Sequence, residues 1–180
     1  MRREPTEIDQ LAVIVIERHT DARGSFGRVF CREEFAALGL VADFVQASTS
    51  VTLHAGTIRG MHFQRPPHEE TKLVRCVRGQ IYDVVADLRP WSPTYMRWQA
   101  FLLGEREDRI LYIPEGCAHG FQTLRDDCEV LYQMSVPHAP HAADGFRFDD
   151  PAFDIQWPLP VGTVGPKDLQ WPPFMGSHPR

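Results

Sequence analysis

The feature that most constrains this chain is a succession of short apolar runs, rich in β-branched and aromatic residues and separated by Pro and Gly. Many such runs at short spacing are typical of a β-sandwich or a β-barrel. The predicted strands cover residues 11–17, 44–53, 57–64, 72–79, 80–88, 96–103, 109–114, 119–124 and 129–135. Helical periodicity is clear only at 32–38, where Gly39 ends the helix. We therefore expect an all-β fold with one or two short peripheral helices.

The length of 180 residues suits one compact domain, and no linker divides the chain, so we expect a single domain over residues 1–180. Two short sequences, Arg78-Gly79 and 125–127, are predicted to be hairpin turns. The stretch 137–173 is rich in Pro, Asp and Trp and is predicted to wrap the outside of the domain as loops and short strands.

The charge balance limits the partners of the chain. There are 19 basic and 24 acidic residues, a net charge of −5. Non-specific electrostatic binding to nucleic acid or to an anionic membrane is therefore not expected. The four cysteines form no C-x-x-C pair, and the first ten residues lack the apolar run of a secretory signal. We therefore expect reduced thiols and a cytoplasmic location.

Alternation along the predicted strands indicates which residues share a face. The predicted sets are His62 with Gln64; Lys72, Val74 and Cys76; Ile81, Asp83 and Val85; His119, Phe121 and Thr123; and Val130, Tyr132 and Met134. If these faces line a barrel, they form an apolar cavity with a few polar groups, which is typical of a small-molecule site. A register slip of one residue would instead turn Lys72 and Asp83 to solvent.

Two segments resemble the signature motifs of the cupin superfamily, whose fold is a double-stranded β-helix or jelly-roll barrel. They are RGMHFQ (59–64) and LYIPEGCAHGF (111–121). Metal-binding cupins carry H-x-H in the first segment, whereas this chain has Gln64 after His62. Glu69 and His119 match the remaining cupin ligands, but two His, a Gln and a Glu are a poor set for a transition metal. We therefore expect no metal.

Over about residues 14–173 the chain resembles a cupin family without metal, the dTDP-4-dehydrorhamnose 3,5-epimerases. The matching segments are Arg23-Gly24, RGMHFQ, KLVRCVRGQIYDVVADLR, SPTYMRW, LYIPEGCAHGF, VLYQMS, DDPAFDIQWPL and PKDLQWP. The resemblance implies epimerisation at C3, C5 or both of a nucleotide-linked 4-keto-6-deoxyhexose, in deoxysugar biosynthesis. No cofactor is implied, because the 4-ketone already acidifies the neighbouring C–H bonds.

The resemblance also implies roles for individual residues. His62 matches the general base, and Asp168 matches the carboxylate that orients it. Lys72 matches the lysine near the 4-keto oxygen, where an ammonium stabilises the enolate. Tyr132 matches the acid that reprotonates the sugar from the opposite face.

The substrate-binding positions follow in the same way. Arg23 and Arg59 match residues that grip the diphosphate, as bidentate guanidinium groups can. The other matched binding positions are Gln46, Ser48, Asp83, His119, His138 and Lys167. The chain departs from the family pattern at Arg28, Ser48, His138 and Ala143. All four belong to nucleotide or substrate binding in the family, so the nucleotide and the sugar stay open.

Other interpretations stay open at this point. A metal-dependent cupin, either a dioxygenase or a sugar-phosphate isomerase, would bind its ion through His62 and His119. A non-catalytic sugar-binding or scaffold cupin would need no base, and a ketoisomerase would move the carbonyl. The family resemblance also implies a homodimer in which residues near the N-terminus reach the partner's pocket.

Overall fold

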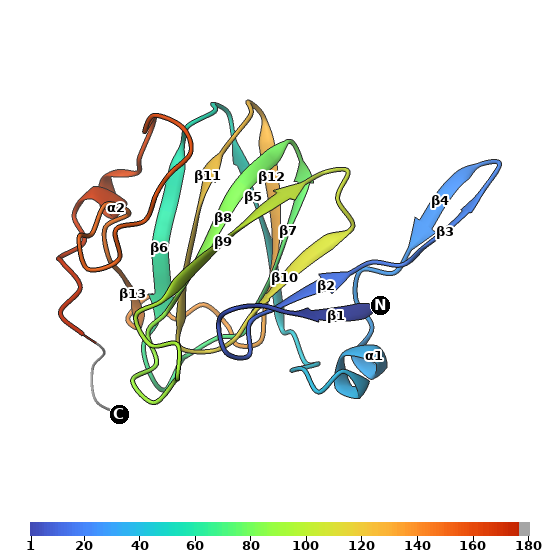
Figure 1. Ribbon diagram of the computed structural model, residues 1–180, viewed down its shortest axis with the longest axis horizontal. Helices are drawn as coiled ribbons and strands as arrows, with labels where there is room; N and C mark the ends of the chain where they lie inside the picture. The colour runs from blue at the N-terminus through green and yellow to red at the C-terminus, as the bar shows by residue number, and fades with distance from the viewer. Residues whose placement is uncertain (177–180) are drawn as a thin grey trace.

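The computed structural model describes residues 1–176, which form two facing antiparallel sheets and a separate hairpin (Figure 1). In this part of the chain the first sheet has the strand order β1-β2-β10-β7-β12-β5. Its strands are β1 (Arg2–Pro5), β2 (Ala12–Val15), β10 (Arg109–Ile113), β7 (Lys72–Arg78), β12 (Cys128–Met134) and β5 (Gln46–Thr52). The second sheet has the order β13-β6-β11-β8-β9. Its strands are β13 (Ala143–Gly145), β6 (Ile58–Gln64), β11 (Cys117–Thr123), β8 (Gln80–Asp87) and β9 (Trp98–Gly104).

The order of the strands along the chain is that of a jelly roll. From β5 to β8 each successive strand changes sheet, and β9 to β12 repeat the alternation after the β8–β9 pair. The hairpin consists of β3 (Arg18–Asp21) and β4 (Gly24–Gly27), and the helices are α1 (Arg32–Ala37) and α2 (Pro166–Leu169). The predicted cupin-type all-β fold with short peripheral helices is thus confirmed.

All nine predicted strands are present, but both predicted hairpin turns are wrong. Arg78-Gly79 joins β7 to β8, and residues 125–127 join β11 to β12, so each crosses from one sheet to the other. Gly79 has φ +78 and Asp127 has φ +54, conformations that reverse the chain equally well in an arch between sheets. The strands β1, β3 and β4 were not predicted, because they are short and mostly polar or glycine-containing, whereas β13 lies in the stretch 137–173 that was predicted to contain short strands.

The main core lies between the two sheets and contains residues of four of the five predicted faces; the fifth is divided, since His62 lines a cavity and Gln64 a different groove. Its buried members include Val74, Cys76, Ile81, Val85, Phe121 and Val130, with Tyr132 packed against them. Lys72 and Asp83 do not point to solvent: the Lys72 side chain is 12% exposed and that of Asp83 is 0% exposed. The interior of the barrel therefore holds charged groups, which require partners there.

Two further clusters cover the outer faces of the sheets. Helix α1 packs Phe35 against the outside of the first sheet, and Gly39, with φ +70, ends it as predicted. The segment 146–157 packs Phe146 and Phe153 against the outside of the second sheet, as predicted for 137–173. The chain then returns beside β6, where Ile58 pairs with Val164, and α2 contacts that strand.

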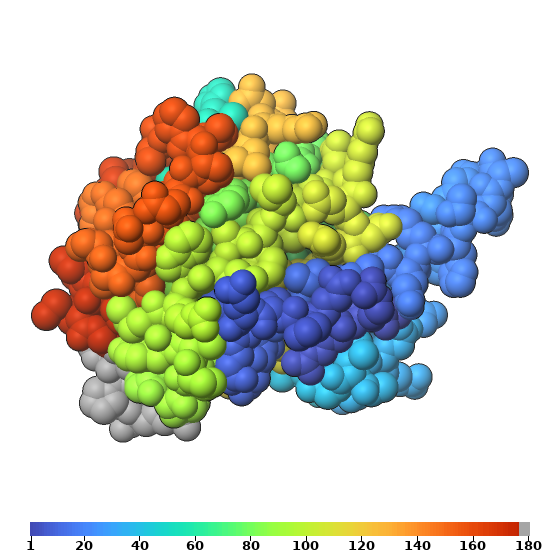
Figure 2. Space-filling view, in the orientation of Figure 1, coloured from blue at the N-terminus to red at the C-terminus, as the bar shows by residue number. Residues whose placement is uncertain are grey.

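The space-filling view shows this C-terminal segment closely packed on the barrel, whereas the β3–β4 hairpin projects into solvent (Figure 2). Among the described residues, no helix has the length and apolar character needed to cross a membrane.

Candidate active site

A cavity of about 230 Å³ lies between the two sheets. It is lined by Ser50, Arg59, His62, Lys72, His119, Phe121, Tyr132 and Asp168. Both sheets contribute, since Ser50, Lys72 and Tyr132 lie on the first and Arg59, His62 and His119 on the second. The volume is below the ~300–1,000 Å³ of a drug-sized pocket, so only part of a larger ligand fits inside.

A bulge in β6 brings Arg59 and His62 to the same side. In a regular β-strand, two residues three positions apart point to opposite faces of the sheet. Here His119 pairs with His62 and Phe121 pairs with Arg59, so three steps on β6 oppose two on β11. The extra residue in β6 turns both side chains to the cavity, as a β-bulge does.

His62 and Asp168 form the shortest polar contact in the cavity. The Nε2 atom of His62 lies 2.6 Å from Oδ1 of Asp168, and the backbone N–H of Gly60 donates to Oδ2 at 3.2 Å. Burial alone would raise the pKa of Asp168, but these hydrogen bonds and the imidazole charge hold that pKa below its usual value. An ionised Asp168 accepts a hydrogen bond from Nε2–H, which keeps the proton on Nε2 and leaves Nδ1 of His62 as the basic nitrogen.

Tyr132 lines the same cavity from the opposite sheet. Its hydroxyl lies 3.4 Å from that of Ser50, and its ring is 6.1 Å from the ring of His119, centroid to centroid. Because His119 is the cross-strand partner of His62, the phenol and the basic imidazole line one cavity, whose open side leaves the His62 side chain 43% exposed. Burial raises the pKa of Tyr132, although Ser50 and Arg59 oppose the shift, so the phenol keeps its proton at neutral pH.

His119 and Asp83 form a second, deeper pair. Nε2 of His119 lies 2.9 and 3.0 Å from the two Asp83 oxygens, and both side chains are buried. Burial raises the pKa of Asp83, and the charges of His119 and Lys72 oppose this shift. The pair places an imidazole firmly at the cavity wall beside Tyr132.

Glu70, which holds the cavity lysine, was not predicted from the sequence. Nζ of Lys72 lies 3.0 Å from Oε1 of Glu70, and both side chains are nearly buried. The other carboxylate oxygen of Glu70 accepts a hydrogen bond from Gln64 at 3.3 Å. The available signal was an acid two residues before Lys72, in the loop that enters β7, because an acid there can reach an inward lysine.

The remaining predicted binding residues lie outside the cavity. Ser48 and Gln46 lie farther along β5 from Ser50, and Gln46 accepts a hydrogen bond from the backbone N–H of His138 at 2.9 Å. Ser50 thus lines the cavity whereas Ser48 does not.

Two more predicted binding residues are farther from the cavity lining. Lys167 stacks on Trp171, with Nζ 5.0 Å from the ring centroid, next to Asp168 in α2. Arg23 lies on the projecting hairpin, where its side chain is 91% exposed and paired with Asp21. Within one chain, therefore, Arg23 is not brought to the cavity.

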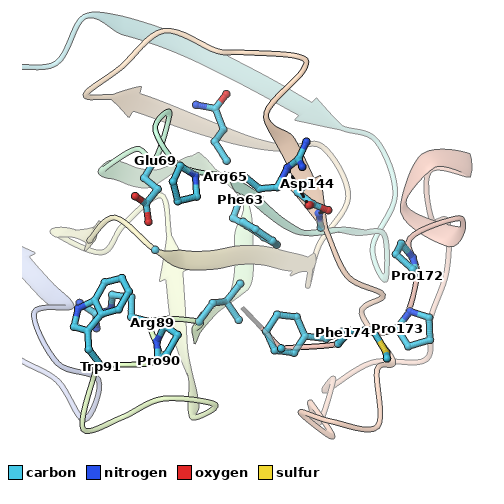
Figure 3. A pocket seen from close by; sticks show the side chains of 17 residues that line it. Phe63, Arg65, Glu69, Arg89, Pro90, Trp91, Asp144, Pro172, Pro173 and Phe174 are labelled. Atoms are coloured by element: carbon cyan, nitrogen blue, oxygen red, sulfur yellow. Dashed lines mark hydrogen bonds and ion pairs between the residues drawn. The ribbon is translucent and has the colours of Figure 1, made fainter. Parts of the chain in front are cut away.

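The four residues that a metal-dependent cupin would use do not converge. His62 and His119 line the cavity, whereas Gln64 and Glu69 line a different, largely apolar groove near the C-terminal segment (Figure 3). The amide of Gln64 is occupied by Ala139 N and His68 O. Among the described residues, no three His, Cys, Asp or Glu side chains gather as a metal-binding group.

A cupin-type barrel that places a His–Asp pair and a buried phenol around one cavity offers groups that can act as a base and as an acid, which is the arrangement expected of an isomerase that inverts a carbon centre by proton transfer. The family model for dTDP-4-dehydrorhamnose 3,5-epimerase matches residues 5–175. The chain belongs to this family, and it is an enzyme of the epimerase type.

The sequence similarity to individual relatives extends over most of each relative's length. The Methanothermobacter thermautotrophicus dTDP-4-dehydrorhamnose 3,5-epimerase is 40% identical over 172 residues, 94% of this chain and 92% of that protein. The Streptomyces niveus dTDP-4-dehydrorhamnose 3-epimerase is 36% identical over 169 residues, 93% of this chain and 81% of that protein.

A solved structure agrees as well. The crystal structure of the Bacillus anthracis dTDP-4-dehydrorhamnose 3,5-epimerase, with TDP and PPi bound, superposes with a TM-score of 0.93 at 33% identity. The match covers 96% of this chain and 99% of that one.

Proposed function

We propose that this protein epimerises a nucleotide-linked 4-keto-6-deoxyhexose of the dTDP-4-dehydro-6-deoxyglucose type at C3, C5 or both, without a cofactor. The observation that carries the proposal is that His62, paired with Asp168 of α2, and Tyr132 lie on opposite sheets around one cavity. Inversion needs a base on one face of the sugar and an acid on the other. The relatives named as 3,5-epimerase and as 3-epimerase support the reaction and leave the number of inverted centres open.

In the proposed reaction, Nδ1 of His62 removes the proton from a carbon next to the ketone. The C–H electron pair forms the C=C bond of an enolate, and the negative charge moves to O4. Asp168 stabilises the imidazolium through its 2.6 Å contact with Nε2. Tyr132 then delivers its proton to the opposite face, and the carbon centre is inverted. Solvent afterwards takes the proton from His62 and returns one to Tyr132.

Charge on the enolate oxygen is stabilised by the ammonium of Lys72 in this scheme. The Glu70 carboxylate holds that ammonium at the cavity wall, with Nζ of Lys72 3.0 Å from Oε1 of Glu70. A preorganised charge that faces the developing oxyanion lowers the barrier because it needs no reorganisation during the reaction. The imidazole of His119, held by Asp83, supplies a second polar group at the same wall.

The diphosphate and the base of the nucleotide lie over the rim in this proposal. Arg59 donates one hydrogen bond to the Thr52 hydroxyl and one to the Val51 carbonyl. A guanidinium has five N–H donors, so the remaining donors can bind phosphate oxygens. In this proposal His138, whose backbone N–H is held by Gln46, contacts the base, and Lys167 and Ser48 contact the part of the nucleotide outside the cavity.

The departures from the family pattern at Arg28, Ser48, His138 and Ala143 concern this same region. They favour an altered nucleotide or sugar preference with unchanged proton transfer. A competition experiment addresses the nucleotide: if dTDP binds no better than CDP, UDP or GDP, then specificity for dTDP is lost.

We further propose a homodimer in the cytoplasm. The β3–β4 hairpin stands away from the barrel, with Phe26 70% exposed and Arg23 at its tip, so it can reach into a second copy of the chain. Arg23 would then complete the diphosphate site of the partner.

The cysteines support the cytoplasmic part of the proposal. All four carry free thiols, and burial raises the pKa of Cys76 and of Cys117 to about 12, which leaves both thiols unreactive.

The decisive experiment follows deuterium uptake by NMR in D2O. dTDP-4-keto-6-deoxyglucose and its CDP and GDP analogues are offered in turn, and the signals at C3 and C5 are monitored. We expect exchange and inversion with at least one donor, and near-total loss of both in His62→Ala. Absence of exchange at both carbons with every donor would contradict the proposed function, and unchanged function in His62→Ala would favour a sugar-binding cupin.

A further inference from the structure

Outside the cavity, two imidazoles that the proposed reaction does not use meet between two loops. His68 lies between β6 and β7, and His141 lies between β12 and β13. Their Nε2 atoms are 3.2 Å apart, and the rings are perpendicular, with centroids 4.8 Å apart and an interplanar angle of 89°. His68 is half-buried and His141 is exposed, so the pair faces solvent on one side.

The backbone at both histidines is tied to the end of β6. The Gln64 amide donates to the carbonyl of His68, and the Arg65 guanidinium donates to the carbonyl of His141, both at 2.9 Å. The side-chain carbonyl oxygen of Gln64 accepts a hydrogen bond from the backbone N–H of Ala139 at 2.6 Å, and the backbone N–H of Arg65 donates to the carbonyl of Ala142 at 2.9 Å. Because the two loops are already fixed, bringing the imidazoles together on a ligand requires little additional ordering.

We propose that His68 and His141 form a binding site for a divalent transition-metal ion of the zinc type. Zinc binds imidazole nitrogen at ~2.0–2.1 Å, so two nitrogens 3.2 Å apart subtend an angle of about 100° at the ion, close to tetrahedral. Imidazole suits zinc, copper and nickel, whereas magnesium and calcium prefer oxygen ligands. A small rotation of each ring replaces the contact between the two nitrogens by two bonds to the metal.

The surroundings make this an exchangeable site. Among the described residues, no third His, Cys, Asp or Glu joins the pair in a metal-binding group, so water completes the coordination. The Arg65 guanidinium beside His141 opposes a cation, and Asp144, 3.3 Å from Nε of Arg65, partly neutralises it.

A bound ion would link the loop at 65–71 to the loop at 135–142. The second loop carries His138, whose backbone Gln46 holds, and the proposed function sets His138 near the nucleotide. The consequence for the nucleotide rests on that proposed function, but the binding of the metal does not. The site can therefore be tested without any substrate.

The test is a calorimetric titration of the full chain with zinc chloride. His68→Ala and His141→Ala are compared with wild type and with His54→Ala, which removes an exposed imidazole that takes no part in the pair. We expect a zinc site in wild type and in His54→Ala, with the affinity at least about tenfold weaker in each pair variant because one of two protein ligands is lost. Thermal unfolding without zinc checks that all variants fold, and zinc should raise Tm only where the pair is intact.

Two results would overturn the proposal. One is an unchanged zinc affinity in His68→Ala and in His141→Ala. The other is loss of zinc binding in His62→Ala with binding retained in His141→Ala, which would place the ion in the cavity.

Discussion

Replacement of Asp168 by Asn tests the His62–Asp168 pair with the smallest change of shape. The substitution removes the charge that faces the imidazole at 2.6 Å. A hydrogen bond to a charged group contributes about 1.5–3 kcal/mol, which corresponds to about a 10- to 150-fold change in rate. If the new amide turns its NH2 group to Nε2, the imidazole proton moves to Nδ1 and the base is blocked. In the Ser-His-Asp triad of serine proteases this tautomer effect lowers kcat by about 10⁴-fold, so we expect kcat to fall here by about 10-fold from loss of the charge alone and by up to about 10⁴-fold with the tautomer change.

The assay follows both product formation and deuterium exchange at C3 and C5. Exchange should fall together with inversion, because both need the base, whereas KM should change little since Asp168 contacts His62 and not the nucleotide end. Asp149→Asn is the matched control: it also removes a carboxylate, but one on the surface paired with Arg147. If Asp168→Asn keeps kcat within about twofold of Asp149→Asn, the assigned role of the pair is refuted.

Three further predictions follow from the geometry. Tyr132→Phe keeps the buried ring and removes the acid, so deuterium should still enter from the His62 face while inversion is lost; NMR that shows continued inversion would exclude Tyr132 as the acid. Glu70→Gln removes the partner of Lys72 and should lower kcat by about tenfold with little change in KM, with Glu70→Asp restoring part of the loss; equal kcat in wild type and Glu70→Gln would contradict the positioning role. The pKa of Asp168 is held below the ordinary aspartate value of 3.8, so its charge stabilises the fold at pH above that value, and this contribution is lost as the pH falls through the lower folded-state pKa. Denaturant unfolding of wild type and Asp168→Asn should therefore show a difference in unfolding free energy that narrows below about pH 4, and a gap that widens on acidification would contradict the sign.

Much of the scaffold was predictable because its information is local. Apolar alternation at 72–79 and 129–135 gave both the strands and their inward faces, since a β-strand repeats every two residues. The short helix was predictable from an apolar stripe and the glycine that ends it. The two wrongly assigned turns, at Gly79 and at 125–127, show the limit: their residues favour chain reversal but do not encode which sheet the next strand joins.

The candidate site was predictable only in part. His62, Asp168, Lys72 and Tyr132 came from the family resemblance, and the structure brings all four to one cavity. Glu70 was missed because its role depends on where the neighbouring lysine points.

Local patterning predicted an all-β sandwich or barrel and the residues that share a strand face, and family motifs indicated which polar groups carry the chemistry. The tertiary fold alone decided that Asp168 lies against His62, 106 residues away. It also decided that the β6 bulge turns Arg59 inward and that Arg23 lies off the cavity of its own chain. The physical reason is that side-chain alternation is fixed by bonds between neighbouring residues. Register, bulges and loop returns are instead fixed by packing between segments distant in the chain.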